Sequence, residues 1–137
     1  MSNADTVKAI YAAFGRGDVD FIINQLADDV EWDVYRNNYG QKAGVPHMQY
    51  RKGPAEVRAF FDDVAKIGIT RFDVLSIMEG GNQVAAEVDW DSPKTDEEEM
   101  HLWTFNDAGK VTRYRHYADT AKHAAHFGAT GRSAGLN

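Results

Sequence analysis

Residues 100–119 have the sequence MHLWTFNDAGKVTRYRHYAD, a pattern that predicts two antiparallel strands joined by a tight turn. The turn falls at residues 106–109, where Asn, Asp and Gly accept the positive φ that short hairpin loops need. The first strand, residues 100–105, is apolar or aromatic on both faces apart from His101 and Thr104. Such a composition is typical of a strand that is covered on both sides. We therefore expect a hairpin whose first strand is buried on both faces.

The second strand, residues 111–119, alternates between a charged face and a face without formal charge. We expect the uncharged face to point inward. A four-residue loop would place His101 opposite Tyr114 and make His116 its diagonal neighbour on the same face. A slip of one residue would separate these side chains. Two imidazoles and a phenol on one inward face are the strongest chemical signal of the sequence. The uncharged face consists of Thr112, Tyr114, His116 and Ala118.

Length and composition exclude several classes of protein. A chain of 137 residues forms one domain with a single core, which we expect at residues 5–127, followed by a flexible tail at 128–137. The net charge of −6 and the absence of a basic run disfavour binding to nucleic acid. Without cysteine, disulfides and thiolate chemistry are excluded. Residues 1–14 do not form a secretory signal, and no apolar run could span a membrane, so we expect a cytoplasmic protein.

Hydrophobic periodicity predicts two helices near the start of the chain. Residues 7–14 repeat apolar side chains at helical spacing, and Asn3 or Asp5 is expected to cap this helix. Asp18 is expected to cap a second, shorter helix at residues 19–26. The pattern then changes to an alternation of period two, which indicates a strand.

The remaining periodic segments predict one longer helix and further strands. The helix begins at Gly53-Pro54, with proline at its first position. Residues 30–34, 72–78 and 83–90 alternate as strands do. Because helices precede most of the strands, we expect an α+β fold with the helices on one face of a curved sheet. The apolar stripe of the longer helix is Val57, Phe60, Phe61, Val64 and Ile67.

Three segments have no clear period. Residues 35–52 predict either a functional lid or a mobile flap, with a short irregular strand around residues 47–51 as a further possibility. Residues 91–99 contain five acidic side chains, so we expect a solvated connection. Residues 120–127 are expected to add one or two helical turns.

Four short segments, in chain order, carry a resemblance to a known family. They are RGD at residues 16–18, LADDV at 26–30, GP at 53–54 and the turn at 105–111. With the order of elements, they resemble the SnoaL-like branch of the NTF2-like superfamily over residues 7–127. These segments are specific for the fold and not for an activity, because the superfamily includes isomerases, cyclases, epoxide hydrolases, dehydratases and non-catalytic binding proteins.

The resemblance implies an α+β cone. A strongly curved mixed or antiparallel sheet wraps around a long helix, two further helices lie at the N-terminus, and a deep pocket opens at one end. It also implies a homodimer that pairs through the outer face of the sheet. Such pairing would cover the second face of the apolar first strand of the hairpin.

The resemblance to ketosteroid isomerases implies which residues of this sequence occupy some of the pocket positions. His101 is at the position of a protonated aspartic acid that helps to hold the enolate oxygen in those enzymes. Tyr114 and Ala118 are at pocket-lining positions. The carboxylate that shuttles the proton corresponds to Val34, and the neighbouring Asp33 points the other way by alternation. This departure argues against isomerisation of the steroid type.

Comparison with other members of the superfamily implies that His116 is a catalytic candidate. It takes the place of an acidic catalytic residue of limonene epoxide hydrolases, whose other catalytic pair would fall near Gln83 and Ala85, so that triad is absent. In polyketide cyclases a single acid or base in the pocket suffices, and His116 or His101 could serve.

The residues and the resemblance together predict acid–base chemistry on a small apolar or carbonyl-bearing ligand. His116 would remove a proton next to a carbonyl or activate a water, while His101 and Tyr114 stabilise the developing oxyanion. The activity would be that of an isomerase, cyclase or lyase; the alternative is a non-catalytic binding or accessory domain. The expected substrate-binding residues are Tyr114, Ala118, Trp32, Val34 and Phe60.

We expect no metal and no cofactor. His101, His116 and Glu87 could in principle converge on a metal, but their spacing matches no established ligand motif. Glu87 and Asp89 share a face of one strand, and we expect at least one of them to face solvent. Arg113 and Arg115 are expected to pair with acids across the sheet or at a dimer seam, and an anion site is the alternative. The histidines expected at the surface are His47, His123 and His126.

Overall fold

The structure is a computed structural model, and it describes residues 1–128 of the chain. Residues 129–137, most of the predicted tail, lie outside this range. One six-stranded sheet has the order β2-β1-β6-β5-β4-β3. The helices are α1 (Asn3–Gly15), α2 (Val19–Asn24), α3 (Tyr39–Lys42), α4 (Pro54–Ala65) and α5 (Thr120–Phe127), with a 3-10 turn η1 (Pro46–Met48). The strands are β1 (Leu26–Val34), β2 (Arg51–Lys52), β3 (Arg71–Gly80), β4 (Gln83–Asp91), β5 (Asp96–Phe105) and β6 (Val111–Tyr117).

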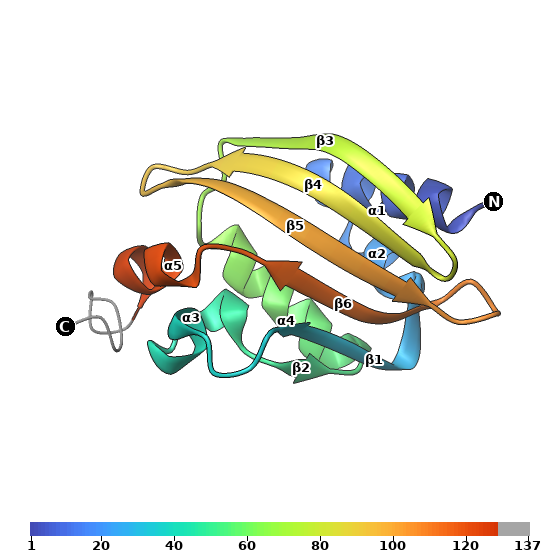
Figure 1. Ribbon diagram of the computed structural model, residues 1–137, viewed down its shortest axis with the longest axis horizontal. Helices are drawn as coiled ribbons and strands as arrows, with labels where there is room; N and C mark the ends of the chain where they lie inside the picture. The colour runs from blue at the N-terminus through green and yellow to red at the C-terminus, as the bar shows by residue number, and fades with distance from the viewer. Residues whose placement is uncertain (129–137) are drawn as a thin grey trace.

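The sheet is curved and mixed, and its concave face is covered by helices (Figure 1). Only β1 and β6 pair in parallel; the other neighbours are antiparallel. Helices α1, α2 and α4 supply apolar side chains to one core with β1, β4, β5 and β6. At one end of the sheet, α3 and α5 pack together over a second, smaller core (Figure 1). This α+β cone confirms the predicted fold class.

The predicted hairpin is formed by β5 and β6, but its register differs from the expected one. His101 pairs directly with His116, and Trp103 pairs with Tyr114. Two features near the turn cause the difference. The loop contains five residues where four were expected, because Phe105 pairs with Val111, and a β-bulge then makes Thr112 an extra residue on β6. Each feature moves the later pairs by one position, so the total shift is two positions. His101 therefore does not lie opposite Tyr114.

The helix starts follow the expected chemistry with one correction. The N-cap of α1 is Ser2, and Asp5 completes a capping box with it, so neither Asn3 nor Asp5 is the cap. Asp18 caps α2 by accepting a hydrogen bond from the amide of Phe21. Before α4 the chain adopts a φ of +83° at Gly53, a conformation that favours glycine.

The segment at residues 35–52 is ordered rather than a simple flap. It forms α3, η1 and β2, and it buries His47 and Met48 beneath the end of the sheet. Its packing against α5 explains why it lacks a surface pattern: several of its side chains belong to the smaller core.

The expectation of a solvated acidic connection at residues 91–99 is wrong for Glu97 and Glu99. Strand β5 already begins at Asp96, and its inward face includes Glu97 and Glu99, which are 2% and 8% exposed. The alternation that runs through Trp103 and Phe105 simply continues upstream into acidic residues. Two buried carboxylates next to the cavity need positive or hydrogen-bonding partners.

The outer face of β5 is only partly covered within one chain. Met100 is 37% exposed, and Leu102 and Thr104 are half-buried. Strand β5 would therefore be covered on both faces, as expected, only if a partner molecule packs against its outer face. Among the described residues, no helix combines the length and hydrophobicity needed to cross a membrane.

Candidate functional site

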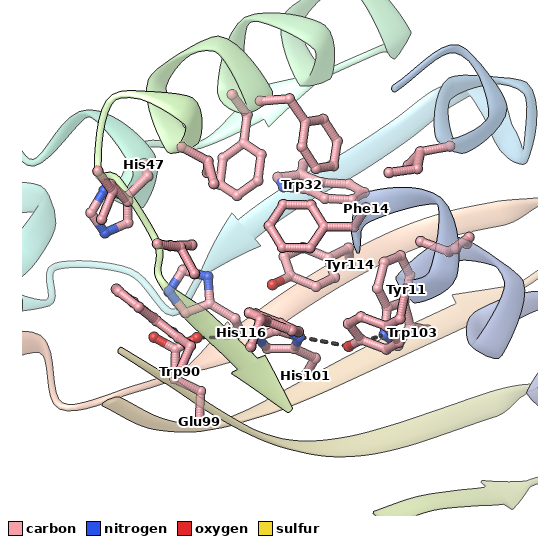
Figure 2. A pocket seen from close by; sticks show the side chains of 18 residues that line it. Tyr11, Phe14, Trp32, His47, Trp90, Glu99, His101, Trp103, Tyr114 and His116 are labelled. Carbon is pink, nitrogen blue, oxygen red and sulfur yellow. Dashed lines mark hydrogen bonds and ion pairs between the residues drawn. The ribbon is translucent and has the colours of Figure 1, made fainter. Parts of the chain in front are cut away.

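A cavity lies between the helices and the concave face of the sheet, and 18 residues line it (Figure 2). Its walls are mainly aromatic, as Figure 2 shows for Phe14, Trp32, Trp90 and Trp103. The volume is about 70 Å³, below the several hundred Å³ typical of pockets that hold drug-sized ligands. A ligand larger than a few atoms must displace side chains on entry.

The polar groups of this cavity gather on β5 and β6. His101 and His116 both line it, with ring centroids 6.0 Å apart. Tyr114 lines it beside them, and its ring centroid is 5.2 Å from that of His101. The structure therefore brings together the two histidines and the phenol that the sequence analysis selected.

Both ring nitrogens of His101 have partners. Its Nε2 lies 3.1 Å from Glu99 Oε1, and its Nδ1 lies 2.6 Å from the hydroxyl of Tyr11. A carboxylate only accepts, so His101 Nε2 donates to Glu99. The Tyr11 hydroxyl also accepts a hydrogen bond from Trp103 Nε1 at 3.1 Å. His101 is thus held by hydrogen bonds on both sides of its ring.

His116 has an unpartnered nitrogen. It is 4% exposed, and within residues 1–128 nothing hydrogen-bonds to its Nε2. Burial lowers its pKa to about 4, the attraction of Glu99 opposes this, and His101 and His123 lower the pKa further. The imidazole is therefore neutral at pH 7. An unpaired buried nitrogen in a cavity wall is costly unless a ligand or a water completes it.

Glu99 joins these histidines to a third from α5. Its Oε2 accepts from His123 Nε2 at 3.1 Å, while Glu97 Oε1 lies 3.1 Å from the same nitrogen. Burial alone would raise the pKa of Glu99, but the hydrogen bonds from His101 and His123 outweigh burial and hold it well below its usual range. Burial alone would lower the pKa of His123, but its bonds to Glu97 and Glu99 raise it to about 9. His123 is therefore an imidazolium at pH 7.

A fourth histidine completes the buried cluster. His47 of η1 contacts His123 through Nε2 and Nδ1 at 2.9 Å. Burial, followed by the charge of His123, lowers the pKa of His47 to about 3. The neutral His47 accepts the hydrogen bond that the charged His123 donates.

The two tyrosines of the cavity remain protonated. Burial raises the pKa of Tyr114 well above its usual range, and the nearby Tyr11 and Glu99 raise it further. Burial also raises the pKa of Tyr11, although the hydrogen bond from Trp103 opposes this. Neutral phenols can donate hydrogen bonds to a ligand oxygen.

Three of the five predicted substrate-binding residues line the cavity: Tyr114, Trp32 and Phe60. Val34 is buried but packs in the smaller core, because α3, η1 and α5 cover that end of β1. Ala118 follows the end of β6 and lines a separate groove near Tyr117. These two positions do not belong to the cavity.

Some predictions for the other charged and titratable residues agree with the structure, and others are wrong. His47 and His123 are buried, so their surface placement is wrong, whereas His126 is exposed. Glu87 is exposed on the outer face, as expected for at least one acid of its pair, and is not near the histidines. Arg115 lies 3.7 Å from Asp33 of the neighbouring β1, in agreement with pairing across the sheet.

Sequence reasoning missed the residues that hold the histidines. Glu97 and Glu99 occupy the same strand face as His101, a signal that was present in the alternation. Tyr11 lies on the apolar stripe of α1, where its hydroxyl gave no separate signal. For His47 and His123 no sequence pattern indicates burial, because both come from irregular or short elements.

One group of buried side chains has the composition of a metal site. Donor atoms of Glu97, Glu99 and His123 all lie within 4.8 Å of one another. The combination of His101, His116 and Glu87, which the sequence disfavours as a metal site, does not converge, because Glu87 points away from the cavity.

Comparison with known proteins agrees with this architecture. Residues 7–114 match the sequence model of the SnoaL-like domain. The chain belongs to the SnoaL-like family. This membership confirms the predicted resemblance. A search of curated proteins finds no match.

Solved structures with this fold have unassigned or varied functions. An NTF2-like protein of unknown function from Burkholderia pseudomallei has a TM-score of 0.74 and 24% identity, covering 93% of this SnoaL-like chain and 98% of its own. TerC, co-crystallised with polyporic acid, has a TM-score of 0.74 and 23% identity, with coverage of 91% and 97%. A candidate isomerase from Rhodopseudomonas palustris has a TM-score of 0.67 and 22% identity, with coverage of 92% and 93%. At such identities the likeness shows a shared fold.

Proposed function

We propose that this SnoaL-like protein binds a small, apolar, carbonyl-bearing molecule in its aromatic cavity and transfers a proton at the carbon next to the carbonyl. The activity would be that of an isomerase, a cyclase or a lyase that uses the protein's own histidines. The observation that carries the proposal is the unpartnered Nε2 of His116, buried in the cavity wall beside His101 and Tyr114.

His116 has the state that a general base requires. Its lowered pKa keeps the ring neutral at pH 7, so a nitrogen lone pair is available. Desolvation also removes competing water from the nitrogen. The low pKa makes His116 a weak base in the resting protein; a developing enolate beside it would stabilise the imidazolium and raise its proton affinity.

Tyr114 would stabilise the oxygen on which negative charge develops. The phenol of Tyr114 is neutral and can donate to an enolate oxygen. The nitrogens of His101 are already bonded to Tyr11 and Glu99, so His101 would help to shape the cavity beside Tyr114.

The comparisons support the class of ligand. TerC was co-crystallised with polyporic acid, and another structure of this fold is a candidate isomerase. The aromatic walls of the present cavity suit a flat apolar ligand with one polar group.

A second candidate is a binding or accessory domain without catalysis. It is favoured by the hydrogen bonds of His101, whose two nitrogens both have partners, so that of the two predicted catalytic histidines only His116 has an unpartnered nitrogen among the described residues. Under this alternative His116 Nε2 would hydrogen-bond a ligand and transfer no proton.

We further propose that the protein forms a homodimer through the outer face of the sheet. Apolar side chains there lie on adjacent strands: Met100 pairs with Tyr117, and Ala85 pairs with Leu102. Met100 and Tyr117 are 37% and 39% exposed. A partner would cover this band and complete the burial of β5.

Proton transfer can be measured without the natural substrate. β-Tetralone, a flat ketone with acidic protons next to its carbonyl, is incubated with the protein in deuterium oxide, and proton NMR follows deuterium incorporation. Wild-type protein is expected to accelerate exchange by about 10²–10⁴-fold over buffer, and His116→Leu should not. Binding of β-tetralone without faster exchange would favour the binding domain. Equal exchange by wild type and His116→Leu would refute catalysis by His116.

A further inference from the structure

We propose that Glu97, Glu99 and His123 form a binding site for a divalent transition metal, with zinc as the best fit, between β5 and α5. The donor set is two carboxylate oxygens and one imidazole nitrogen, a combination that suits zinc. The site lies beside the cavity, since Glu99 also lines it. The inference goes beyond the proposed proton transfer, although both proposals use the unpartnered Nε2 of His116.

The three ligands converge because of where the fold places them. Glu97 and Glu99 are two residues apart on β5, so both side chains point to the inward face. His123 lies in the first turns of α5, whose start is fixed by the Asp119 cap. His123 Nε2 is 3.1 Å from Glu97 Oε1 and 3.1 Å from Glu99 Oε2. Two ligands on one tetrahedral zinc lie about 3.4 Å apart when each bond is about 2.1 Å.

Each ligand is also oriented from its far side. Metal-binding histidines and carboxylates commonly use their other polar atom for a hydrogen bond that fixes the ligand. All three residues show this arrangement, and each second partner is buried. The bonds join Thr95 Oγ1 to Glu97 Oε2 at 2.7 Å, His101 Nε2 to Glu99 Oε1 at 3.1 Å and His47 Nε2 to His123 Nδ1 at 2.9 Å.

The charge of the cluster favours a dication. Glu97, Glu99 and His123 are 2%, 8% and 0% exposed, so two carboxylates are removed from water together. Lys122 approaches Glu97 at 3.9 Å, but its ammonium also contacts Asp96 near the surface. A divalent cation at the centre would neutralise both buried carboxylates directly.

His116 indicates that a ligand or a water is still to be bound beside this cluster. The residue is only 4% exposed, and its Nε2 lacks a hydrogen-bond partner among the described residues. Its ring centroid is 6.3 Å from that of His123, and Glu99 is the strongest charge acting on it. A zinc ion with three protein ligands keeps a fourth position for water. A water in that position, on the cavity side, would give His116 Nε2 the partner that it lacks.

The test measures bound metal rather than turnover, so its result is separate from the fate of the proposed function. The full-length protein is stripped with a chelator, incubated with zinc, dialysed and analysed for metal content; titration calorimetry gives the affinity. Cobalt, which replaces zinc, reports its coordination by visible absorption. We expect one metal ion per chain and a thermal midpoint that rises on zinc addition.

Matched variants locate the site. Glu97→Gln and His123→Gln remove one ligand each while keeping the size of the side chain, and each should weaken zinc binding by at least tenfold. Thr95→Val keeps all three ligands but removes the hydroxyl that bonds Glu97 Oε2 and the Asp96 carbonyl, and it should weaken binding by about 10–100-fold. His126→Gln changes an exposed histidine on the same helix and should bind like wild type.

Two outcomes would overturn the proposal. One is a wild-type protein that retains no zinc after dialysis, which would mean that the protonated His123 is the sole bridge between the carboxylates. The other is zinc binding that survives in folded Glu97→Gln protein, with circular dichroism establishing the fold, since the metal would then lie elsewhere.

Discussion

His101 and His116 face each other directly across β5 and β6, with their ring centroids 6.0 Å apart. The two rings differ in their hydrogen bonding: His101 is held by Tyr11 and Glu99, whereas His116 Nε2 has no partner in the described chain. One histidine is therefore fixed and the other is free to bind. This difference determines the expected behaviour of variants.

His116→Leu is expected to stabilise the protein while removing its function. The substitution replaces a buried, unpaired nitrogen with an apolar side chain of similar size, which should raise the free energy of unfolding by about 1 kcal/mol. Urea denaturation followed by circular dichroism measures the change. His126→Leu, at an exposed position, is the control and should leave the midpoint unchanged. A large destabilisation by His116→Leu would show that the nitrogen already has a partner in solution.

Tyr11→Phe is expected to destabilise the protein by about 1–3 kcal/mol, because Trp103 Nε1 and His101 Nδ1 both lose their partner. Tyr50→Phe is the matched control: its hydroxyl bonds Glu31 at the surface, and its loss should cost little. Chemical denaturation of both variants gives the comparison. Equal effects would mean that the buried chain of hydrogen bonds adds nothing to stability.

Stability of the chelator-treated protein should be greatest near pH 6.5. The pKa of His123 is raised to about 9, so its contribution is complete below the unfolded value near 6.5 and is lost as the pH rises to 9. The pKa values of His47 and His116 are lowered to about 3 and 4, so the unfolded chain takes up protons first and stability falls below pH 6.5. Each group changes the stability by at most about 1.4 kcal/mol per pH unit.

Thermal midpoints measured between pH 4 and pH 9 would test this optimum. Stability that rises steadily up to pH 9 would contradict a charged His123. The variant His123→Gln should lose the alkaline decline and keep the acid one.

Ala85→Glu is expected to convert the proposed dimer into a monomer, because it places a charge between the apolar side chains of Met78 and Leu102 on the outer face of the sheet. Ala125→Glu adds the same charge at an exposed position of α5 and should not change the assembly. Light scattering coupled to size exclusion determines the mass of each. A wild-type monomer at all concentrations would exclude the dimer.

Periodicity alone predicted most of the architecture. The helices at α1, α2 and α4 and the alternation of β1, β4 and β6 follow from apolar spacing and caps. The register of β5 and β6 did not follow, because the loop is one residue longer than expected and a bulge at Thr112 adds a second shift, and neither feature leaves a mark in the composition of the turn.

The polar half of the site was harder to predict than the apolar half. A run of acidic residues normally indicates solvent, yet Glu97 and Glu99 are buried because His123 and His101 lie within hydrogen-bond distance. Those partners come from a distant helix and from the same strand. Sequence spacing brings Glu99 near His101, but only the packing of α5 brings His123 to them.

The most direct measurement of the central claim is a crystal structure of the protein soaked with β-tetralone. The account predicts that the ketone occupies the aromatic cavity with its carbonyl oxygen or the carbon next to it against His116, and Tyr114 within hydrogen-bond distance of the oxygen. A ketone bound outside the cavity, or a His116 Nε2 already bonded to a protein atom, would contradict it.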